Sequence, residues 1–319
     1  MKFAALIARV ATMFCVLCAS SAARDAADVP RDRVRTVVDD AIRPLMTKDN
    51  IPGIAVGITI AGKSRVFNYG VASTETHMPV TGDTLFEVGS VTKTFTATLA
   101  SWAQVNNQLS LTDNVDKYLP TLKNTPFGNL TLLNLGTHTS GGLPLQLPND
   151  VRNHDQLMQY LKAWRPNHPP GKYRTYANPG IGILGVIAAK SMGQDFAALV
   201  EQRLFPALGM TSSFINVPPT RMSDYAQGYT TGGKPVRMST GVVSSEAYGI
   251  KSTAADLIHF VEGNMNLIKL DGKLQLAITD THTGYFQAGV MTQDLMWEQY
   301  PYPVELKTLL EGNSSPMIF

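Results

Sequence analysis

The order of elements along the sequence predicts an α+β protein. Residues 30–48 place apolar residues at helical spacing. Residues 53–60 and 65–71 are rich in β-branched and aromatic residues, and the Gly-containing segment 61–64 between them predicts a hairpin. A helix followed by two antiparallel strands favours an α+β arrangement over a parallel wound sheet.

The middle of the chain is predicted to be mainly helical. Residues 90–107 predict a helix whose buried stripe consists of Val91, Phe95, Leu99 and Trp102. Two more helices are expected at 181–192 and 195–208. Proline, glycine and polar residues predict loops at 109–148, 165–180 and 216–243, the first with short helical pieces and the last with weak strands.

Further along, Thr253 with Asp256 three residues later predicts a helix N-cap. We expect residues 30–75 to begin an α/β layer and 85–265 to form the mainly helical region. Residues 266–319 are then expected to form a further part of the α/β layer, with its C-terminal strands missing. A two-stranded sheet is not independently stable, so further strands are expected from the C-terminal end.

Composition excludes several classes of protein. The chain has 319 residues, of which 44% are hydrophobic and 16% charged, which suits a globular enzyme with a sizeable core. The formal net charge of +2 is too small for a nucleic-acid binder. No later apolar run is long enough to span a membrane. We expect a monomer that binds a small molecule, with no nucleic-acid or membrane partner.

The first 23 residues predict an export signal. Lys2 and Arg9 are basic, an apolar run covers 10–17, and small residues follow at 19–23. Both cysteines of the chain, Cys15 and Cys18, fall inside this leader. Cleavage after Ala23 would leave a mature protein without thiols, in the periplasm or secreted.

Ser90 and Lys93 are the strongest chemical signal in the sequence. They stand three residues apart at the start of the predicted helix, so the hydroxyl and the amine share one face. A serine hydroxyl needs a neighbouring base to become a good nucleophile. The helix N-terminus also favours developing negative charge, by about 0.3–1 kcal/mol.

Two further segments carry polar groups suited to a cleft. In an extended segment, Tyr176 and Asn178 would point the same way, because residues two apart share a face. The phenol could exchange protons if a nearby ammonium lowered its pKa, and the amide could hold an amide substrate. The other segment, 136–146, is glycine-rich and ends at Gln146.

Four segments together carry a resemblance to the class C serine β-lactamases of the penicillin-recognising serine enzyme superfamily. They are Phe86-Glu87-Val88-Gly89-Ser90-Val91-Thr92-Lys93, residues 139–146, Tyr176-Ala177-Asn178, and Ala247-Tyr248-Gly249-Ile250-Lys251-Ser252. The similarity extends from about residue 30 to 319. It implies a serine β-lactamase or penicillin-binding transpeptidase-like fold, in which helices flank an antiparallel sheet beside a mainly helical domain, so 24–319 would be one β-lactamase domain.

The resemblance also implies roles for six residues. Ser90 would be the acylated nucleophile, with its backbone N–H as half of the oxyanion hole. Lys93 and Tyr176 would shuttle protons. Asn178 and Gln146 would bind the amide side chain of a β-lactam, and Tyr248 would line the adjacent wall. The implied reaction is hydrolysis of cephalosporins and penicillins through an acyl-enzyme, conferring antibiotic resistance.

No metal or other cofactor is implied, because the six histidines are scattered without ligand spacing. The sequence lacks the Ser-Asp-Asn element of class A enzymes and the histidine cluster of zinc lactamases. The family also carries a Lys-Thr-Gly motif on a core strand, and the sequence contains no such triplet. His282-Thr283-Gly284 predicts a helix-end turn instead. On this basis the chain resembles a C-terminally truncated member, and we expect residues 1–319 alone to be poorly folded and inactive.

Three alternative functions remain open at this point. Two belong to the same superfamily: a D-alanyl-D-alanine peptidase and a serine esterase. The third is a remnant that binds lactams without turning them over. The combination of Leu143-Pro144-Leu145-Gln146 with Tyr176-Ala177-Asn178 favours the lactamase.

Overall fold

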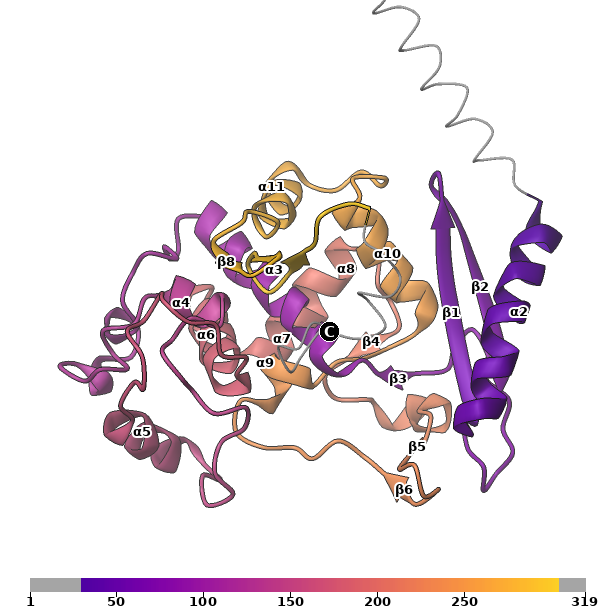
Figure 1. The fold of residues 1–319 in the computed structure, drawn as a ribbon, viewed down its shortest axis with the longest axis horizontal. Helices are drawn as coiled ribbons and strands as arrows, with labels where there is room; N and C mark the ends of the chain where they lie inside the picture. Colours follow the sequence, from indigo (N-terminus) through magenta and orange to yellow (C-terminus); the bar gives the residue numbers. More distant parts are fainter. Residues whose placement is uncertain (1–29, 304–319) are drawn as a thin grey trace, which may run out of the picture. The chain divides into compact units, whose positions relative to one another are not determined.

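A computed structural model describes residues 30–303 as two compact units (Figure 1). The first unit contains 30–84, Ser223–Arg237 and Thr253–Lys269, and the second contains Leu85–Met222, Met238–Ser252 and 270–303. The predicted leader, 1–23, and residues 304–319 lie outside the described residues. The domain limits expected from the sequence stay a prediction.

The first unit is built on a hairpin. Strands β1 (Gly53–Ile60) and β2 (Lys63–Gly70) pair antiparallel, with Ile60 opposite Lys63. Its other elements are α2 (Arg31–Asp49), α10 (Ala254–Asn264), and the short strands β5 (Gly228–Tyr229) and β6 (Pro235–Val236). The predicted helix and hairpin are therefore confirmed, although β2 begins two residues earlier than expected.

Helices α2 and α10 cover opposite faces of this hairpin (Figure 1). Val34 and Val38 of α2 form a buried cluster with Phe67 and Tyr69 of β2, and alternate residues of β1 pack against it. Gly57 points to the other face, where a Cβ would lie 2.6 Å from the side chain of Ile258. Glycine at this position thus lets α10 approach β1 closely.

Polar contacts tie both helices to the strands. The Tyr69 hydroxyl donates to Asp39 at 2.6 Å, and this hydrogen bond is the main reason that the pKa of Asp39 is lowered. On the α10 side, the buried Glu262 carboxylate accepts hydrogen bonds from the hydroxyls of Thr59 and Ser64. These contacts fix the register of the helices on the hairpin.

The second unit is mainly helical, with small antiparallel sheets. Its α-helices are α3 (Thr92–Val105), α4 (Leu132–Gly136), α5 (His154–Ala163), α6 (Asn178–Ser191), α7 (Phe196–Leu199), α8 (Phe205–Ala207), α9 (Ser244–Tyr248) and α11 (Gly272–Asp280). A π-helical segment, η4 (Val200–Leu204), joins α7 to α8, and 3-10 turns occur at η1 (Gly89–Val91), η2 (Val115–Lys117) and η3 (Pro120–Leu122). A further 3-10 turn, η5 (Pro219–Asp224), includes the last residue of the segment Leu85–Met222 and the first residues of Ser223–Arg237. The sheets consist of β3 (Phe86–Glu87), β7 (Lys251–Ser252) and β4 (Ser213–Phe214), and of β8 (Phe286–Ala288), β9 (Met291–Gln293) and β10 (Glu298–Gln299).

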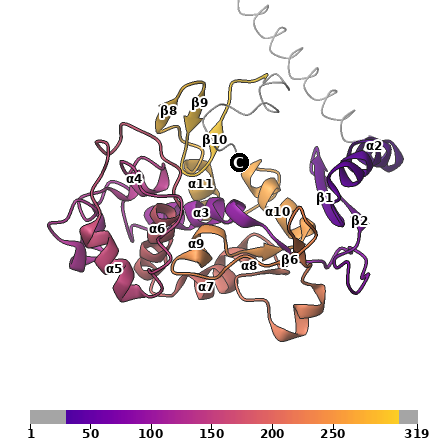
Figure 2. The same ribbon diagram turned by 60° about the horizontal axis from the view of Figure 1, so that its bottom comes forward.

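Helix α3 is the core of this unit and packs against α6, α9 and α11 (Figure 2). Phe95 and Leu99 are fully buried on it, as the apolar stripe predicts. Val91 belongs to the same predicted stripe, and that part of the prediction is wrong. Val91 is 47% exposed because it lies in the 3-10 turn η1, one residue before the α-helix begins.

Close backbone approach brings α6 against α3 and α9. A Cβ at Gly185 would lie 2.8 Å from the Cβ of Glu246 in α9 and 2.9 Å from the Thr96 methyl in α3. Glycine is therefore required where the three helices meet. Helix α6 begins at Asn178, so the predicted loop 165–180 ends three residues too late. Pro179 is compatible with the first turn of a helix, because a backbone N–H at that position has no hydrogen-bond partner within the helix.

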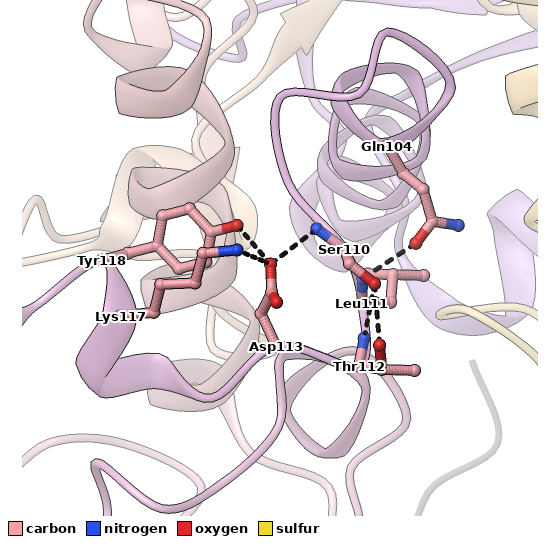
Figure 3. A network of polar contacts seen from close by, with 7 residues as sticks. All are labelled: Gln104, Ser110, Leu111, Thr112, Asp113, Lys117 and Tyr118. Carbon is pink, nitrogen blue, oxygen red and sulfur yellow. Dashed lines mark hydrogen bonds and ion pairs between the residues drawn. The ribbon is translucent and has the colours of Figure 1, made fainter.

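The loop after α3 is held by a carboxylate (Figure 3). Asp113 accepts hydrogen bonds from the Ser110 N–H, the Lys117 amine and the Tyr118 hydroxyl. The contacts to Lys117 and Tyr118 are the main reasons that the pKa of Asp113 is lowered. Gln104 of α3 accepts the Leu111 N–H at 2.8 Å, so the loop is anchored to the helix as well.

Two predictions for the ends of helices α11 and α10 are confirmed. Helix α11 is followed by a turn in which His282 donates its N–H to Thr279, and Thr283 donates to Asp280. His282-Thr283-Gly284 is thus a helix-end turn. In the first unit, Thr253 caps α10 and accepts the Asp256 N–H at 3.1 Å.

Within residues 30–303, no single helix has the length and apolar composition to cross a membrane. Helix α6 and the segment Phe196–Ala207 meet these criteria only as a pair, with a 70° bend between them.

Candidate active site

Ser90 and Lys93 lie in contact at the N-terminal end of α3. Gly89 adopts a positive φ of 54° and leads into the 3-10 turn that carries Ser90, and Lys93 follows in the first turn of the α-helix. Lys93 Nζ lies 2.8 Å from Ser90 Oγ and 2.9 Å from the Ala247 carbonyl oxygen. The predicted juxtaposition of hydroxyl and amine is confirmed.

The lysine is deeply buried. Lys93 is 2% exposed, and burial lowers its pKa to about 7. Burial removes the water that stabilises an ammonium. At pH 7, the Lys93 amine is therefore neutral in a large fraction of the molecules. A neutral amine at hydrogen-bond distance can accept the proton of the serine hydroxyl.

Tyr176 faces the same two residues. Its ring centroid lies 5.0 Å from Lys93 Nζ, and the Ser90 side chain beside it acts to lower the pKa of its phenol. The lowered pKa that the sequence analysis considered for this phenol is not found. Burial raises the pKa of Tyr176 above 10, and this effect exceeds the lowering by Ser90 and Arg174. Because the Lys93 pKa is itself near 7, Lys93 is only partly charged at neutral pH.

Two residues beside Tyr176 were missed by the sequence analysis. The buried His138 ring stacks on it at 4.4 Å between centroids, and His138 Nδ1 accepts the Ala177 N–H. Burial lowers the pKa of His138 well below its usual value, so the imidazole is neutral. The Arg174 guanidinium lies 5.9 Å from the tyrosine ring and forms an ion pair with Glu298 in which both side chains are buried.

A signal for Arg174 was present in the sequence. It stands two residues before Tyr176, in the same predicted extended segment, and therefore on the same face. Nothing in the spacing of His138 points to a contact with Tyr176, because that contact depends on the tertiary fold.

Asn178 and Gln146 lie together at the wall of the site. The Asn178 backbone N–H donates to the carbonyl of Leu145, which fixes the two segments side by side. The Asn178 side chain is 7% exposed, and its Oδ1 atom has no hydrogen-bond partner within the part of the chain that the structure describes. A buried acceptor of this kind is suited to an N–H group of a ligand.

Tyr248 is positioned by the segment 247–252. The Ile250 N–H donates to the Thr92 hydroxyl at 3.1 Å, and the Ile250 carbonyl accepts the Val88 N–H. Strand pairing of Phe86 with Ser252 extends this contact. These bonds tie the segment that carries Tyr248 to the turn that carries Ser90.

A pocket of about 400 Å³ brings together five of the six predicted residues, and Lys93 does not line it. Its lining is Gly89, Ser90, Leu145, Gln146, Tyr176, Asn178, Met238, Ser239 and Tyr248. Met238 and Ser239 come from the segment 216–243, which the sequence analysis predicts as a loop with weak strands and assigns no role at the site. The Met238 N–H donates to the Glu87 carboxylate at 3.2 Å, so the segment is held beside the site.

No cluster of three or more histidine, cysteine, aspartate or glutamate side chains suited to a metal ion occurs in residues 30–303. The polar groups of the site are thus a hydroxyl, an amine, a phenol and amides. This set is suited to acyl transfer through a serine.

Comparison with known proteins identifies the family of this chain. The β-lactamase family model matches residues 38–317. A β-lactamase of Lysobacter lactamgenus is 52% identical over 296 residues, which are 93% of this chain and 75% of that protein. The solved structure of a D-alanine carboxypeptidase, AmpC, from Burkholderia cenocepacia is 57% identical, with a TM-score of 0.86 over 91% of this chain and 81% of that one.

A class C β-lactamase solved in complex with cefoxitin is 50% identical, with a TM-score of 0.87, and the match covers 90% of this chain and 80% of that chain. Fold and site together define a serine hydrolase of the penicillin-recognising type. The chain belongs to the β-lactamase family, and its similarity is to class C members. The expected α+β fold of this family is confirmed.

Proposed function

We propose that this protein hydrolyses β-lactam antibiotics through an acyl-enzyme on Ser90. The observation that carries the proposal is the contact of Ser90 Oγ with a buried amine, Lys93 Nζ, at 2.8 Å. Family membership supports the same reaction.

Lys93 is proposed as the base in acylation. Neutral Lys93 takes the proton of Ser90 as Oγ attacks the lactam carbonyl carbon. The new C–O bond forms, the ring C–N bond breaks, and the ring nitrogen receives a proton. A base with a pKa of about 7 suits this step, because it is partly free at neutral pH and becomes a good proton donor once protonated.

Tyr176 is proposed as the proton carrier to the ring nitrogen. Its raised pKa keeps the phenol protonated at neutral pH, and it lines the same pocket as Ser90. The Ser90 backbone N–H, at the N-terminal end of α3, supports the developing oxyanion. A water molecule then attacks the ester, which releases the acid and returns a proton to Ser90.

Asn178, Gln146 and Tyr248 are proposed to bind the substrate. The Asn178 side-chain oxygen would accept the amide N–H of an acylamino side chain, and the exposed Gln146 amide would bond its carbonyl. Tyr248 is half-buried and contributes an apolar wall to the same pocket.

A D-alanyl-D-alanine carboxypeptidase is a second candidate. The observation that favours it is the 57% identity to a structure named as a D-alanine carboxypeptidase. Both reactions use the same acyl-enzyme chemistry, so the Ser90 site alone does not separate them. The combination of Leu143-Pro144-Leu145-Gln146 with Tyr176-Ala177-Asn178, together with the β-lactamase family match, favours the lactamase.

Three substrates distinguish these functions: a chromogenic cephalosporin, a peptide that ends in D-alanyl-D-alanine, and a short-chain ester. We expect the highest kcat/KM with the cephalosporin. A higher kcat/KM with the peptide would indicate a peptidase instead, and a higher kcat/KM with the ester would indicate an esterase. Acylation of Ser90 measured by mass spectrometry tests the chemistry separately from turnover.

Export to the periplasm is part of the proposal. It is supported by the basic, apolar and small-residue order of residues 1–23. A monomer without a membrane partner after cleavage is also proposed. Fractionation of expressing cells and the mass of the released protein test location and cleavage after Ala23.

A further inference from the structure

We propose that Arg152 directs this site toward β-lactams whose acylamino side chain ends in a carboxylate. The inference rests on the proposed function and deepens it by naming a substrate class. It follows from a second cavity, from the charge of its lining, and from the contacts of one guanidinium.

A second cavity of about 550 Å³ continues from the pocket of Ser90. The two share Gln146, Asn178, Ser239 and Tyr248. A substrate bonded to Ser90, with its amide at Asn178, would therefore extend the rest of its acylamino side chain into the second cavity. This volume exceeds what an amide alone requires, so a side chain of several atoms fits there.

Arg152 contributes the charge of this cavity. Its lining includes amides, hydroxyls and apolar side chains, and Arg152 is its charged member. The two cavities together are lined by no aspartate or glutamate from the described residues. A carboxylate that enters would meet a positive charge and no opposing negative one.

The guanidinium is positioned but not neutralised. Arg152 Nε donates to the Asn149 carbonyl at 3.1 Å, and its backbone N–H donates to Gln156 Oε1 at 2.8 Å. Within residues 30–303, Arg152 forms no ion pair with any carboxylate, including its sequence neighbour Asp150. Its two terminal amino groups are thus available to a carboxylate in the bidentate geometry that arginine favours.

The expected preference is modest because Arg152 is exposed. Exposed charge pairs contribute about 0.2–1 kcal/mol, and about 1 kcal/mol corresponds to a fivefold change in rate. Salt should weaken the preference, since screening acts on exposed charges.

Two cephalosporins that differ in one group provide the test. One carries a glutaryl side chain that ends in a carboxylate, and the other carries the same chain with a terminal carboxamide. The second-order rate of Ser90 acylation is measured for each by intact-mass spectrometry. The parent chain should favour the carboxylate, and Arg152→Gln should lower the carboxylate-to-amide ratio by up to about fivefold. Arg152→Lys should retain most of it.

Arg165 provides a matched control. It is an exposed arginine at the other end of α5, it also donates to main-chain carbonyls, and it lines neither cavity. Arg165→Gln should leave the ratio unchanged. An Arg152→Gln ratio equal to that of the parent, or an equal loss with both substrates, overturns the inference alone. Failure of both compounds to acylate the parent overturns the proposed function and the inference with it.

Discussion

Lys93 Nζ lies within hydrogen-bond distance of both Ser90 Oγ, at 2.8 Å, and the Ala247 carbonyl, at 2.9 Å. The carbonyl holds the amine in place from the α9 side, while the burial of Lys93 disfavours its charge. The amine is thereby fixed beside the hydroxyl in the state that accepts a proton. This relationship leads to a pH dependence.

Acylation of Ser90 should rise with pH through a midpoint near 7, because the neutral form of Lys93 increases as pH passes its pKa of about 7. Rates of acylation by a penicillin, measured from about pH 5 to about pH 9, give this profile. A rate that is flat over this range would show that Lys93 is not the titrating base.

Replacing Lys93 with methionine should abolish most acylation and yet stabilise the fold. The pKa of Lys93 falls from 10.5 in the unfolded chain to about 7 in the folded protein, so the unfolded chain binds more protons between these values. The cost of burying the charge is therefore largest at pH 7 and below, and it disappears as pH rises to 10.5.

We expect Lys93→Met to raise the free energy of unfolding by about 1–3 kcal/mol at pH 7, with a smaller gain at pH 10. Thermal melting at the two pH values measures this difference. Equal gains at both pH values would indicate a packing effect without a contribution from charge.

Arg174 and Glu298 form a buried ion pair beside Tyr176, and Arg174 Nε also donates to Gln293 Oε1 at 2.5 Å. Arg174→Met should leave the Glu298 carboxylate buried without its cation and cost about 3–5 kcal/mol of stability. The double variant Arg174→Met, Glu298→Gln should recover a large part of this loss. Denaturant unfolding of the single and double variants measures the coupling, and additive losses would contradict it.

Asp294 is fully buried, and burial raises its pKa to about 6, although the Gln299 amide partly offsets this. The folded protein therefore binds the proton more tightly than the unfolded chain, whose pKa is near 3.8. The free energy of unfolding therefore decreases as pH rises from about 4 to about 6, because Asp294 becomes charged while it is buried. Above this range its contribution no longer changes.

Asp294→Asn should thus stabilise the protein by about 1–3 kcal/mol at pH 8 and have little effect at pH 4. Melting curves at both pH values test this, with the exposed Asp150→Asn as control. A gain of the same size at pH 4 would contradict the assignment to charge burial.

The parts of the fold that depend on local pattern were predictable from the sequence. The stripe of α2 and the turn at Ala61 and Gly62 determine the first helix and hairpin, and three-residue spacing places Ser90 against Lys93. The start of α6 at Asn178 was missed because loop-forming residues precede it and Pro179 allows either a loop or a first helical turn.

The environment of Tyr176 was not predictable in the same way. Its pKa is set by how deeply the ring is buried among His138, Arg174 and Lys93, which come from distant segments. Sequence spacing identified Tyr176 and Lys93 as site residues. It could not show that burial raises the pKa of Tyr176 more than nearby charges lower it. Met238 and Ser239 were missed for a similar reason, because a carboxylate on β3, Glu87, holds their loop at the site.

The central claim is that β-lactams acylate Ser90, and one measurement tests it most directly. The full chain and its Ser90→Ala variant are mixed with a penicillin, and the adduct is located by peptide mass spectrometry. We predict an adduct of the mass of the intact penicillin on the peptide that contains Ser90, and none in the variant. An adduct on a different residue, or equal labelling of the Ser90→Ala variant, would contradict the account.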